Sequence, residues 1–393
     1  MSRVRTFGET KEPERRMIIA VNTRFLQKGK LEGIGWFTRE TLSRITKDHP
    51  VHRFIFIFDR PYDDAFIFSE NVIPVVLPPV TETPLCWFIW FEIQIPRILK
   101  KYKADLFLSP DGFLSLRTRI RQLPVIHDIN FAHRPKDFPW LTSIYYRLLF
   151  PHFAKRAKRI VTVSLFSKED ISRLYKIAPE NIDVVYNGVN MLYSAILPEE
   201  KIKAKEKYSE GKDYFLYVGS LHPRKNIPGL LRAYDAFRMA TGKDINLIIA
   251  GCKITESQDV NLDKTFKGMR FGKNVIFTGR LNSEDLHEVL GAATALIFVP
   301  FIEGFGIPVI EGMRAGIPVI CSNTTSLPEV GGDAVLYADP FSVDQIRDAM
   351  IRIIENEVLK NSLIKKGLKQ QQKFSWDRTA DSLWGSIQIC MNS

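Results

Sequence analysis

Cysteine is scarce in this 393-residue sequence, and the four cysteines (Cys86, Cys252, Cys321 and Cys390) lie far apart. No two of them form a CxxC pair, which argues against a zinc site and against a disulfide framework. We therefore expect the cysteines to be mostly small core residues in a protein of a reducing compartment.

Long apolar runs are also missing. No stretch reaches the roughly 18 uninterrupted apolar residues of a membrane-spanning helix, so none is expected. The first 16 residues are charged and lack the apolar middle of a secretory signal peptide. We interpret residues 1–16 as a disordered tail before a first strand near Met17, and we expect a cytoplasmic protein.

The composition is that of a globular protein, with 45% hydrophobic and 25% charged residues. The length exceeds what one ordinary core supports and predicts two domains. Most of the net charge of +11 falls in residues 1–200, with the strongest excess of Lys and Arg in 101–176. A basic first half favours an anionic partner such as a phosphate, a membrane surface or a nucleic acid, and the alternative is a role in solubility alone.

Short apolar and β-branched runs alternate with helical patterns along the whole chain. Because these runs are nearly continuous rather than strictly alternating, they predict sheets that are buried on both faces. The alternation itself predicts parallel sheets with crossover helices, an α/β fold of two Rossmann-like domains facing across a cleft. The runs are MIIAVNTRF, RFIFIFD, VIPVVLP, ADLFLSP, LPVIHDI, RIVTVS, IDVVYNG, YFLYVGS, INLIIAG, NVIFTGR, ALIFVPF, PVICSN and AVLYADP.

The alternation breaks once, between residues 190 and 213, where the segment LPEEKIKAKEKYSEGKD is charged and lacks a strand pattern. This segment predicts a linker between an N-terminal domain at 17–195 and a C-terminal domain at 196–375. The segment FSWDRTADSLWGSIQIC predicts an amphipathic helix at 376–393 after a Ser375 cap. We expect this helix to pack back across the N-terminal domain.

Two carboxylates, Glu303 and Glu311, interrupt the apolar stretch FIEGFGIPVIEGMRAGIPVICSN. The pattern predicts a buried strand, a glycine loop that carries Glu303, and a helix that begins at Pro308. Glu311 would then lie in the first helical turn, where the helix dipole keeps it ionised. Ionised carboxylates that accept hydrogen bonds from a vicinal diol suit a sugar or a ribose. The alternative is that Glu303 caps the helix and Glu311 is solvated.

Two further loops have the residue types of an anion site. Arg224 and Lys225, in GSLHPRKN, follow a strand and can clamp a diphosphate, the alternative being a solvated loop. Gly33 and Gly35 precede the helical pattern WFTRETLSRI, and such a turn is an anion cradle. The spacing from Gly33 to Thr38 lacks the third glycine of a dinucleotide fingerprint, which weakens a nicotinamide dehydrogenase as an interpretation.

His127 and Asp128 close the predicted strand LPVIHDIN, where a cleft residue belongs. We take His127 as a candidate catalytic residue. Asp128 either orients His127 or caps the turn.

The spacing of Glu303 and Glu311 resembles the signature of retaining GT-B glycosyltransferases, glycosyltransferase family 4. Other segments resemble the family in its order and extend the likeness over roughly residues 17 to 390. These segments are EGIGWFTRETL, VIHDIN, RIVTVSLFSKEDI, IDVVYNGVN, YVGSLHPRKNIPGLLRAY and VIFTGRLNSEDLHEVLGAATALIFVP.

The resemblance implies retaining, metal-independent transfer of a hexosyl group (mannosyl or glucosyl) in cell-envelope polysaccharide synthesis, without a cofactor. The donor would be a UDP- or GDP-linked sugar, and the acceptor a glycan or a lipid-linked glycan. His127 would meet the donor sugar, Arg224 and Lys225 its diphosphate, Glu303 its hydroxyls, and Glu311 the ribose. The further donor-binding residues would be Gly33, Gly35, Gly219, Arg280, Leu281, Gly304, Phe305, Gly306 and Ile307.

Other functions remain as alternatives. A sugar-nucleotide epimerase of the same fold would need no acceptor, and a phosphorylase would need a cofactor lysine site that the sequence does not show. A nucleic-acid-binding protein would use the basic half, but no nucleic-acid motif is present, so we expect no nucleic-acid partner. The segment 83–105, aromatic and then basic, suggests a helix on the cytoplasmic face of the inner membrane. The alternative for that segment is a core helix with a solvated basic end.

Overall fold

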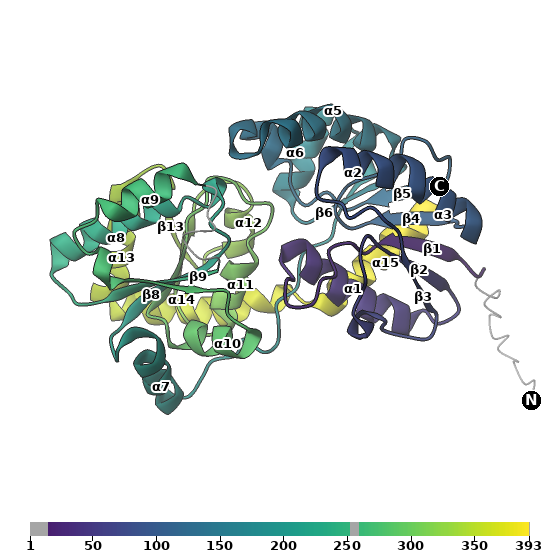
Figure 1. Ribbon diagram of the computed structural model, residues 1–393. Coiled ribbons are helices and arrows are strands. Elements are labelled where there is room, and N and C mark those ends of the chain that lie inside the picture. Colours follow the sequence, from purple (N-terminus) through teal and green to yellow (C-terminus); the bar gives the residue numbers. More distant parts are fainter. Residues whose placement is uncertain (1–14, 252–258, 393) are drawn as a thin grey trace, which may run out of the picture.

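The computed structural model describes residues 15–251 and 259–392. It contains two large parallel sheets, one in each half of the chain. The first sheet has the order β3-β2-β1-β4-β5, the second β10-β9-β8-β11-β12-β13, and β6 pairs with β7 (Figure 1). Every strand pairing is parallel, which confirms the predicted α/β fold of two Rossmann-like domains. Residues 1–14 of the predicted tail at 1–16 lie outside the described residues, and so does Cys252.

Each apolar run that predicted a strand overlaps one, although LPVIHDI shares only Leu123 and Pro124 with β5. Strands β1 to β7 fall within residues 17–195 and strands β8 to β13 within 196–375. The strands are β1 (Ile18–Asn22), β2 (Arg53–Phe58), β3 (Val72–Val76), β4 (Leu106–Ser109), β5 (Arg121–Pro124), β6 (Ile160–Thr162), β7 (Ile182–Val184), β8 (Tyr214–Gly219), β9 (Asn246–Gly251), β10 (Val275–Gly279), β11 (Ala295–Phe298), β12 (Val319–Ser322) and β13 (Leu336–Ala338).

Helices connect the strands and cover the sheets. In the first half they are α1 (Gly33–Asp48), α2 (Pro84–Ile89), α3 (Ile95–Tyr102), α4 (Asn130–His133), α5 (Trp140–Arg156) and α6 (Leu165–Tyr175). The predicted linker contains α7 (Pro198–Ser209). In the second half they are α8 (Ile227–Thr241), α9 (Val260–Lys267), α10 (Ser283–Ala292), α11 (Ile307–Arg314), α12 (Leu327–Gly331), α13 (Val343–Glu355), α14 (Glu357–Gln370) and α15 (Trp376–Asn392).

Both sheets reverse their winding direction at a central strand. In the first sheet the chain runs outward from β1 to β3 and returns beside β1 as β4, and in the second it runs from β8 to β10 and returns as β11. Ligands of such sheets bind outside the carboxyl ends of the strands at this reversal. The fold therefore predicts a site where the loops after β1, β4, β8 and β11 lie.

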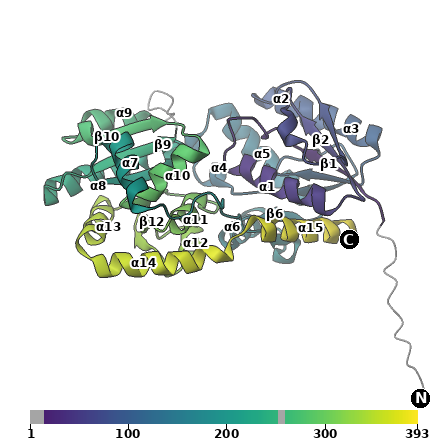
Figure 2. The same cartoon turned by 90° about the horizontal axis from the view of Figure 1, so that it is seen from below.

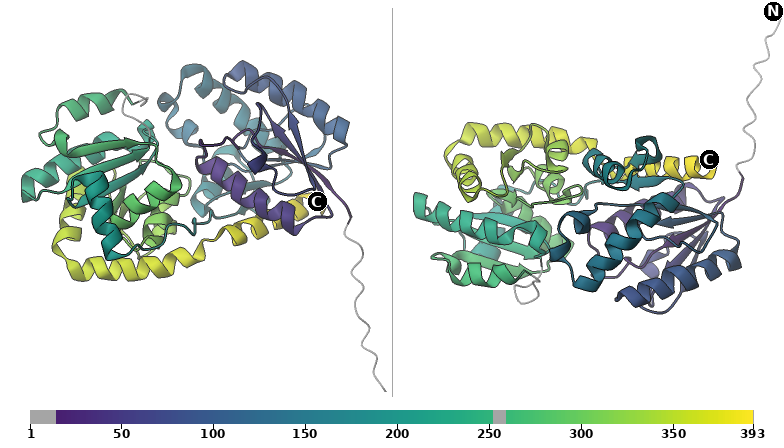
Figure 3. Two further views of the ribbon diagram at one scale, coloured as in Figure 1. Left: turned by 60° about the horizontal axis from the view of Figure 1, so that its bottom comes forward. Right: turned by 90° about the horizontal axis from the view of Figure 1, so that it is seen from above.

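The last helix returns to the first half of the molecule. Helix α15 follows α14 along one side and packs on α1 (Figures 2 and 3). The imidazole of His49 stacks on Trp384 with ring centroids 3.7 Å apart, and Arg44 pairs with Asp377 at 2.5 Å. The Ser375 hydroxyl accepts a hydrogen bond from the backbone N–H at position 378 (3.2 Å), the cap expected from the sequence.

The aromatic segment 83–105 does not form one continuous α-helix. A π-helical turn (Trp90–Gln94) separates α2 from α3. The side chains of Trp87, Trp90, Phe91 and Leu99 are buried in the core, while Leu85 and Phe88 are exposed. The segment therefore contributes one buried apolar face to the core. Within the described ranges, no helix combines the length and the apolar content that crossing a membrane requires.

The cysteines that the structure describes are free. Cys321 and Cys390 are buried and Cys86 is half-buried.

Candidate active site between the two domains

The basic turn after β8 and the glycine loop after β11 meet in a buried ion cluster. The turn is a short 3₁₀ helix (Pro223–Lys225), and Glu303 lies in the loop. The guanidinium of Arg224 donates to Oε2 of Glu303 at 2.6 Å, and Nζ of Lys225 donates to the same oxygen at 2.5 Å. The three side chains are only 9–18% exposed. The structure thus brings together three of the four predicted catalytic residues.

Charge attraction dominates the ionisation of this cluster. Burial alone would raise the pKa of Glu303, but the charges of Arg224 and Lys225 outweigh it and lower that pKa to about 2. Burial opposes the charge of Arg224, yet attraction to Glu303 and Asp128 raises the pKa of Arg224 above its ordinary value. The pKa of Lys225 is lowered by burial and by repulsion from Arg224. The cluster therefore carries two cations on one carboxylate and has an excess of positive charge for an anion.

Asn226 holds the basic turn in place. Its backbone is left-handed (φ +59°), and its side-chain amide donates to the carbonyls of Val299 (3.1 Å) and Pro340 (2.7 Å). The N–H of Phe301 donates to the carbonyl of Arg224 at 2.9 Å. These bonds fix the turn against the loop after β11. The sequence prediction missed Asn226, although an asparagine that directly follows a basic pair after a strand is a signal for a left-handed residue.

The glycine loop also contacts the first half of the chain. A Cβ on Gly304 would lie 2.4 Å from the carbonyl oxygen of His127, so only glycine fits there. The Ser167 hydroxyl lies 3.0 Å from that carbonyl and 3.4 Å from the carbonyl of Gly304. Phe305 is buried, and Gly306 has a positive φ of +102° directly before α11. The loop that carries Glu303 is therefore packed tightly between the two domains.

His127 is half-buried, and its surroundings favour the neutral imidazole. Burial lowers the pKa of its imidazole below the ordinary value. Nε2 lies 2.9 Å from the carbonyl oxygen of Pro110, and because a carbonyl only accepts, Nε2 carries the proton and Nδ1 is an acceptor. The edge of the ring meets Phe37 at 5.1 Å.

The position of His127 differs from the prediction, and the contacts of its neighbour Asp128 decide between the two roles left open for that residue. Strand β5 ends at Pro124, so His127 lies in the loop beyond the strand rather than at its end. Asp128 accepts a hydrogen bond from the N–H of Asn130 at 3.1 Å. Asp128 therefore caps the turn before α4, the second of the two roles left open by the sequence.

Glu311 lies beyond the first turn of its helix, and its carboxyl has a higher pKa than the prediction of an ionised group requires. Helix α11 begins at Ile307, not at Pro308, so Glu311 is its fifth residue and lies outside the first turn. Burial raises the pKa of Glu311 to about 7, so the prediction of a fully ionised group was wrong. Beyond the first turn the dipole does not compensate for lost hydration. Within the described ranges its carboxylate has no hydrogen bond or ion pair, which leaves it free for a ligand.

The glycine pair Gly33 and Gly35 opens α1 instead of preceding it, because the helix begins at Gly33. A Cβ on Gly35 would lie 2.9 Å from the carbonyl of Phe25, whereas Gly33 faces open space. Arg280, after β10, reaches this helix start from the other domain and donates to the carbonyl of Leu31 at 2.6 Å. Arg280 thus joins the second domain to the segment directly before Gly33.

The remaining predicted donor residues lie at the carboxyl ends of the second sheet. Gly219 ends β8 with φ +146° and packs directly against Gly251, where a Cβ would lie 1.9 Å from the Gly219 carbonyl. Leu281 follows β10 and Ile307 begins α11, and both are half-buried. Among the described residues, no three His, Cys, Asp or Glu side chains converge in a way that could hold a metal ion.

Two facing Rossmann-like domains with a cationic turn at the strand ends define the GT-B class of glycosyltransferases. The family profile described as "Glycosyl transferases group 1" matches residues 198–370, and that of "Glycosyltransferase Family 4" matches residues 31–191. The chain is 35% identical over 280 residues to O-antigen chain mannosyltransferase B of Escherichia coli, covering 71% of this chain and 73% of that protein. The chain therefore belongs to glycosyltransferase family 4 and is a glycosyltransferase.

Other similar proteins agree with this assignment. The chain is 29% identical over 306 residues to O-antigen chain mannosyltransferase RfbU of Salmonella typhimurium, covering 74% of this chain and 81% of that one. Its fold matches sucrose-phosphate synthase of Thermosynechococcus elongatus with a TM-score of 0.77 at 18% identity, covering 96% of this chain and 100% of that chain. It also matches HepE of Anabaena in complex with UDP-glucose, with a TM-score of 0.75 at 17% identity and coverages of 95% and 100%.

Proposed function

We propose that this glycosyltransferase moves a mannosyl group from a nucleotide-diphosphate sugar, UDP- or GDP-linked, to a glycan or lipid-linked glycan in cell-envelope polysaccharide synthesis. The mannosyl group is favoured because both of the sequence relatives described above are O-antigen mannosyltransferases. The observation that carries the proposal is the buried cluster of Arg224, Lys225 and Glu303 at the end of β8. Such a cluster has the positive charge that a leaving nucleoside diphosphate requires.

We assign the role of each candidate residue from its position in the site. Arg224 and Lys225 bind the diphosphate and stabilise the charge that develops on it as the sugar leaves. Glu303 lies beside them in the loop and accepts hydrogen bonds from the hydroxyls of the sugar. His127 meets the sugar from the other domain, and the carboxylate of Glu311 binds the ribose. The resemblance to retaining enzymes leads us to propose retention of the anomeric configuration. Because no carboxylate of the first domain is assigned as a nucleophile, we propose that it occurs without a covalent sugar–enzyme intermediate.

A transfer assay with a panel of UDP-, GDP- and ADP-linked sugars tests the proposal. We expect a nucleotide-linked mannose to raise the melting temperature and to be consumed when a cell-envelope glycan acceptor is added. The product linkage, assigned by NMR, should show retention. Interconversion of the sugar nucleotide without an acceptor would instead support an epimerase, and a panel without any binding would contradict the proposal.

Metal independence is a second arm of the same assay. Since Arg224 and Lys225 supply the positive charge at the diphosphate, we expect EDTA to leave the initial rate unchanged within about twofold. A strict requirement for added Mg²⁺ would contradict this part of the proposal.

The titration of Glu311 predicts a pH dependence of donor binding. Ribose hydroxyls donate best to an ionised carboxylate. With a pKa of about 7, the Glu311 carboxyl is partly protonated near neutral pH, so donor binding is coupled to loss of the Glu311 proton. Donor affinity should therefore rise between pH 6 and pH 8 by about tenfold, measured with an intact nucleotide sugar, whose phosphates stay ionised over this range. In Glu311→Gln the affinity should be weaker and independent of pH.

The stability of the same variant is a control that involves no ligand. Because the folded protein binds the Glu311 proton more tightly than the unfolded chain, wild type loses stability as the pH rises from about 4.5 through 7. Glu311→Gln removes this loss, so its stability relative to wild type should rise by about 2 kcal/mol between pH 5 and pH 8. A constant difference across this range would contradict the raised pKa.

A further inference from the structure

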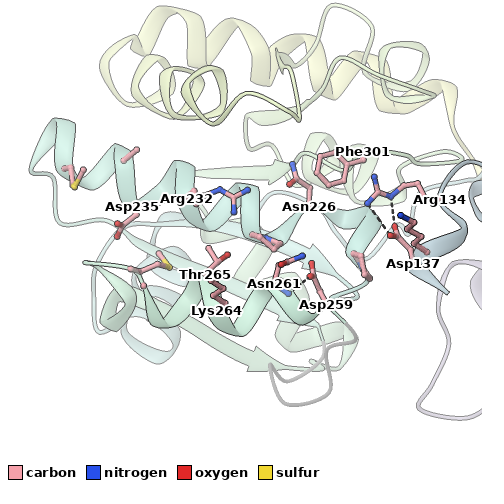
Figure 4. Close-up of a pocket in the computed structure, with 17 residues that line it drawn as sticks. Arg134, Asp137, Asn226, Arg232, Asp235, Asp259, Asn261, Lys264, Thr265 and Phe301 are labelled. Carbon is pink, nitrogen blue, oxygen red and sulfur yellow. Dashed lines mark hydrogen bonds and ion pairs between the residues drawn. The ribbon is translucent and has the colours of Figure 1, made fainter. Parts of the chain in front are cut away.

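A groove with a cavity volume of about 940 Å³ lies beside the candidate site, and no predicted catalytic or donor-binding residue lines it. Helices α8 and α9 form its walls, and the segment 134–137 of the first domain closes one end (Figure 4). The groove includes Pro223 and Asn226, which flank Arg224 and Lys225 on either side. It therefore adjoins the basic turn but is a separate binding space.

The acidic side chains of the groove are already engaged. Asp137 is paired with Arg134 at 2.5 Å, and that guanidinium also lies 4.8 Å from the ring centre of Phe301. Asp235 accepts two backbone hydrogen bonds, from positions 270 (3.3 Å) and 271 (2.8 Å). Asp259 accepts one from position 261 at 2.9 Å. Among the described residues, none of these carboxylates forms an ion pair with another cation of the groove.

Three cations of the groove have no such partner. Within residues 15–251 and 259–392, the side chains of Lys136, Arg232 and Lys264 make no hydrogen bond or ion pair. They come from three separate elements: the turn before α5, helix α8 and helix α9. Cations that line one cavity without an ion-pair partner attract an anion, and several separated donors suit the multiple oxygens of a phosphate.

We propose that this groove binds a phosphate or diphosphate group carried by the acceptor. This inference rests on the proposed function, because a groove that spans both domains beside the basic turn is placed to hold an acceptor near the leaving diphosphate. Met239, Met269 and Phe301 give the groove an apolar side for the rest of that molecule. Trp140 (74% exposed) and Leu141 (61%) follow Asp137 closely in the chain, and their exposed apolar side chains suit a lipid-linked source.

A binding experiment tests the anion site without any sugar transfer. Inorganic pyrophosphate is titrated at low ionic strength into the Arg224→Gln protein, which lacks one of the two cations assigned to the donor diphosphate. We expect Lys264→Gln in this background to weaken pyrophosphate binding about tenfold. Lys267→Gln is the matched control on the same helix, because Lys267 pairs with Asp263 at 2.5 Å and does not line the groove. Equal affinities of the two variants, or no binding, would overturn the proposal.

A kinetic experiment distinguishes the source of the phosphate. With otherwise wild-type protein, Lys264→Gln should raise the KM about tenfold for an acceptor that carries phosphate, with kcat unchanged. The KM for the same glycan without phosphate should not change. A polyprenyl-diphosphate glycan and a soluble glycosyl phosphate form the two arms, and the arm with the larger change identifies the ligand. If neither KM changes while donor binding persists, the groove proposal fails and the proposed function stands.

Discussion

Replacement of Arg224 by glutamine should lower kcat by about 10²- to 10³-fold, the loss that follows removal of one preorganised electrostatic donor. As the glycosidic bond breaks, the leaving diphosphate gains negative charge. The guanidinium of Arg224 is buried and already oriented, with its NH1 bonded to Glu303 and to the carbonyl of Ile302 at 3.1 Å. Its attraction is therefore stronger in the transition state than in the ground state, and kcat should fall more than donor affinity.

Arg224→Lys is the matched variant for this prediction. It keeps the positive charge but loses the planar fork, so its kcat should lie between those of wild type and Arg224→Gln. Thermal unfolding of both variants separates a loss of catalysis from a loss of folding. Wild-type turnover in a folded Arg224→Gln protein would contradict the role of Arg224 at the diphosphate.

Much of the fold could be predicted because buried parallel strands leave a local signal. Runs such as YFLYVG and INLIIAG are apolar at nearly every position, and they form the central strands β8 and β9. The aromatic segment 83–105 was harder to interpret. A core helix and a membrane-surface helix share the same apolar face, and only the packing of side chains such as Trp90 and Phe91 distinguishes them.

The sequence named the residues of the ion cluster as candidates but did not show their interactions. The order of Arg224, Lys225 and Glu303 in the sequence does not show that one carboxylate oxygen binds both cations, because that contact joins loops after β8 and β11. The charge of Glu311 was mispredicted for a similar reason. The local pattern placed the helix start to within one residue, whereas the loss of hydration that raises a pKa depends on the whole surrounding fold.

Glu303→Gln should bind nucleoside diphosphate at least about tenfold more tightly than wild type while transferring sugar much more slowly. In the ligand-free protein the carboxylate of Glu303 occupies both cations of the basic turn, so an incoming diphosphate competes with it. Glutamine removes that competing charge. It also removes the ionised acceptor that we assign to the sugar hydroxyls, and the transfer rate should fall by about 10² or more. Calorimetric titration and initial rates measure the two effects separately.

The same substitution should destabilise the ligand-free protein by about 3 kcal/mol, because it leaves Arg224 and Lys225 buried without a counter-charge. Since the pKa of Glu303 is about 2, its ionisation contributes stability that is present above the ordinary pKa of a glutamate and is lost only as the pH falls toward 2. The difference from wild type should therefore stay constant from pH 5 to pH 8, unlike that of Glu311→Gln. Weaker diphosphate binding by a folded Glu303→Gln protein would show that the carboxylate does not compete with the ligand. The assignment of both cations to the diphosphate would then be wrong.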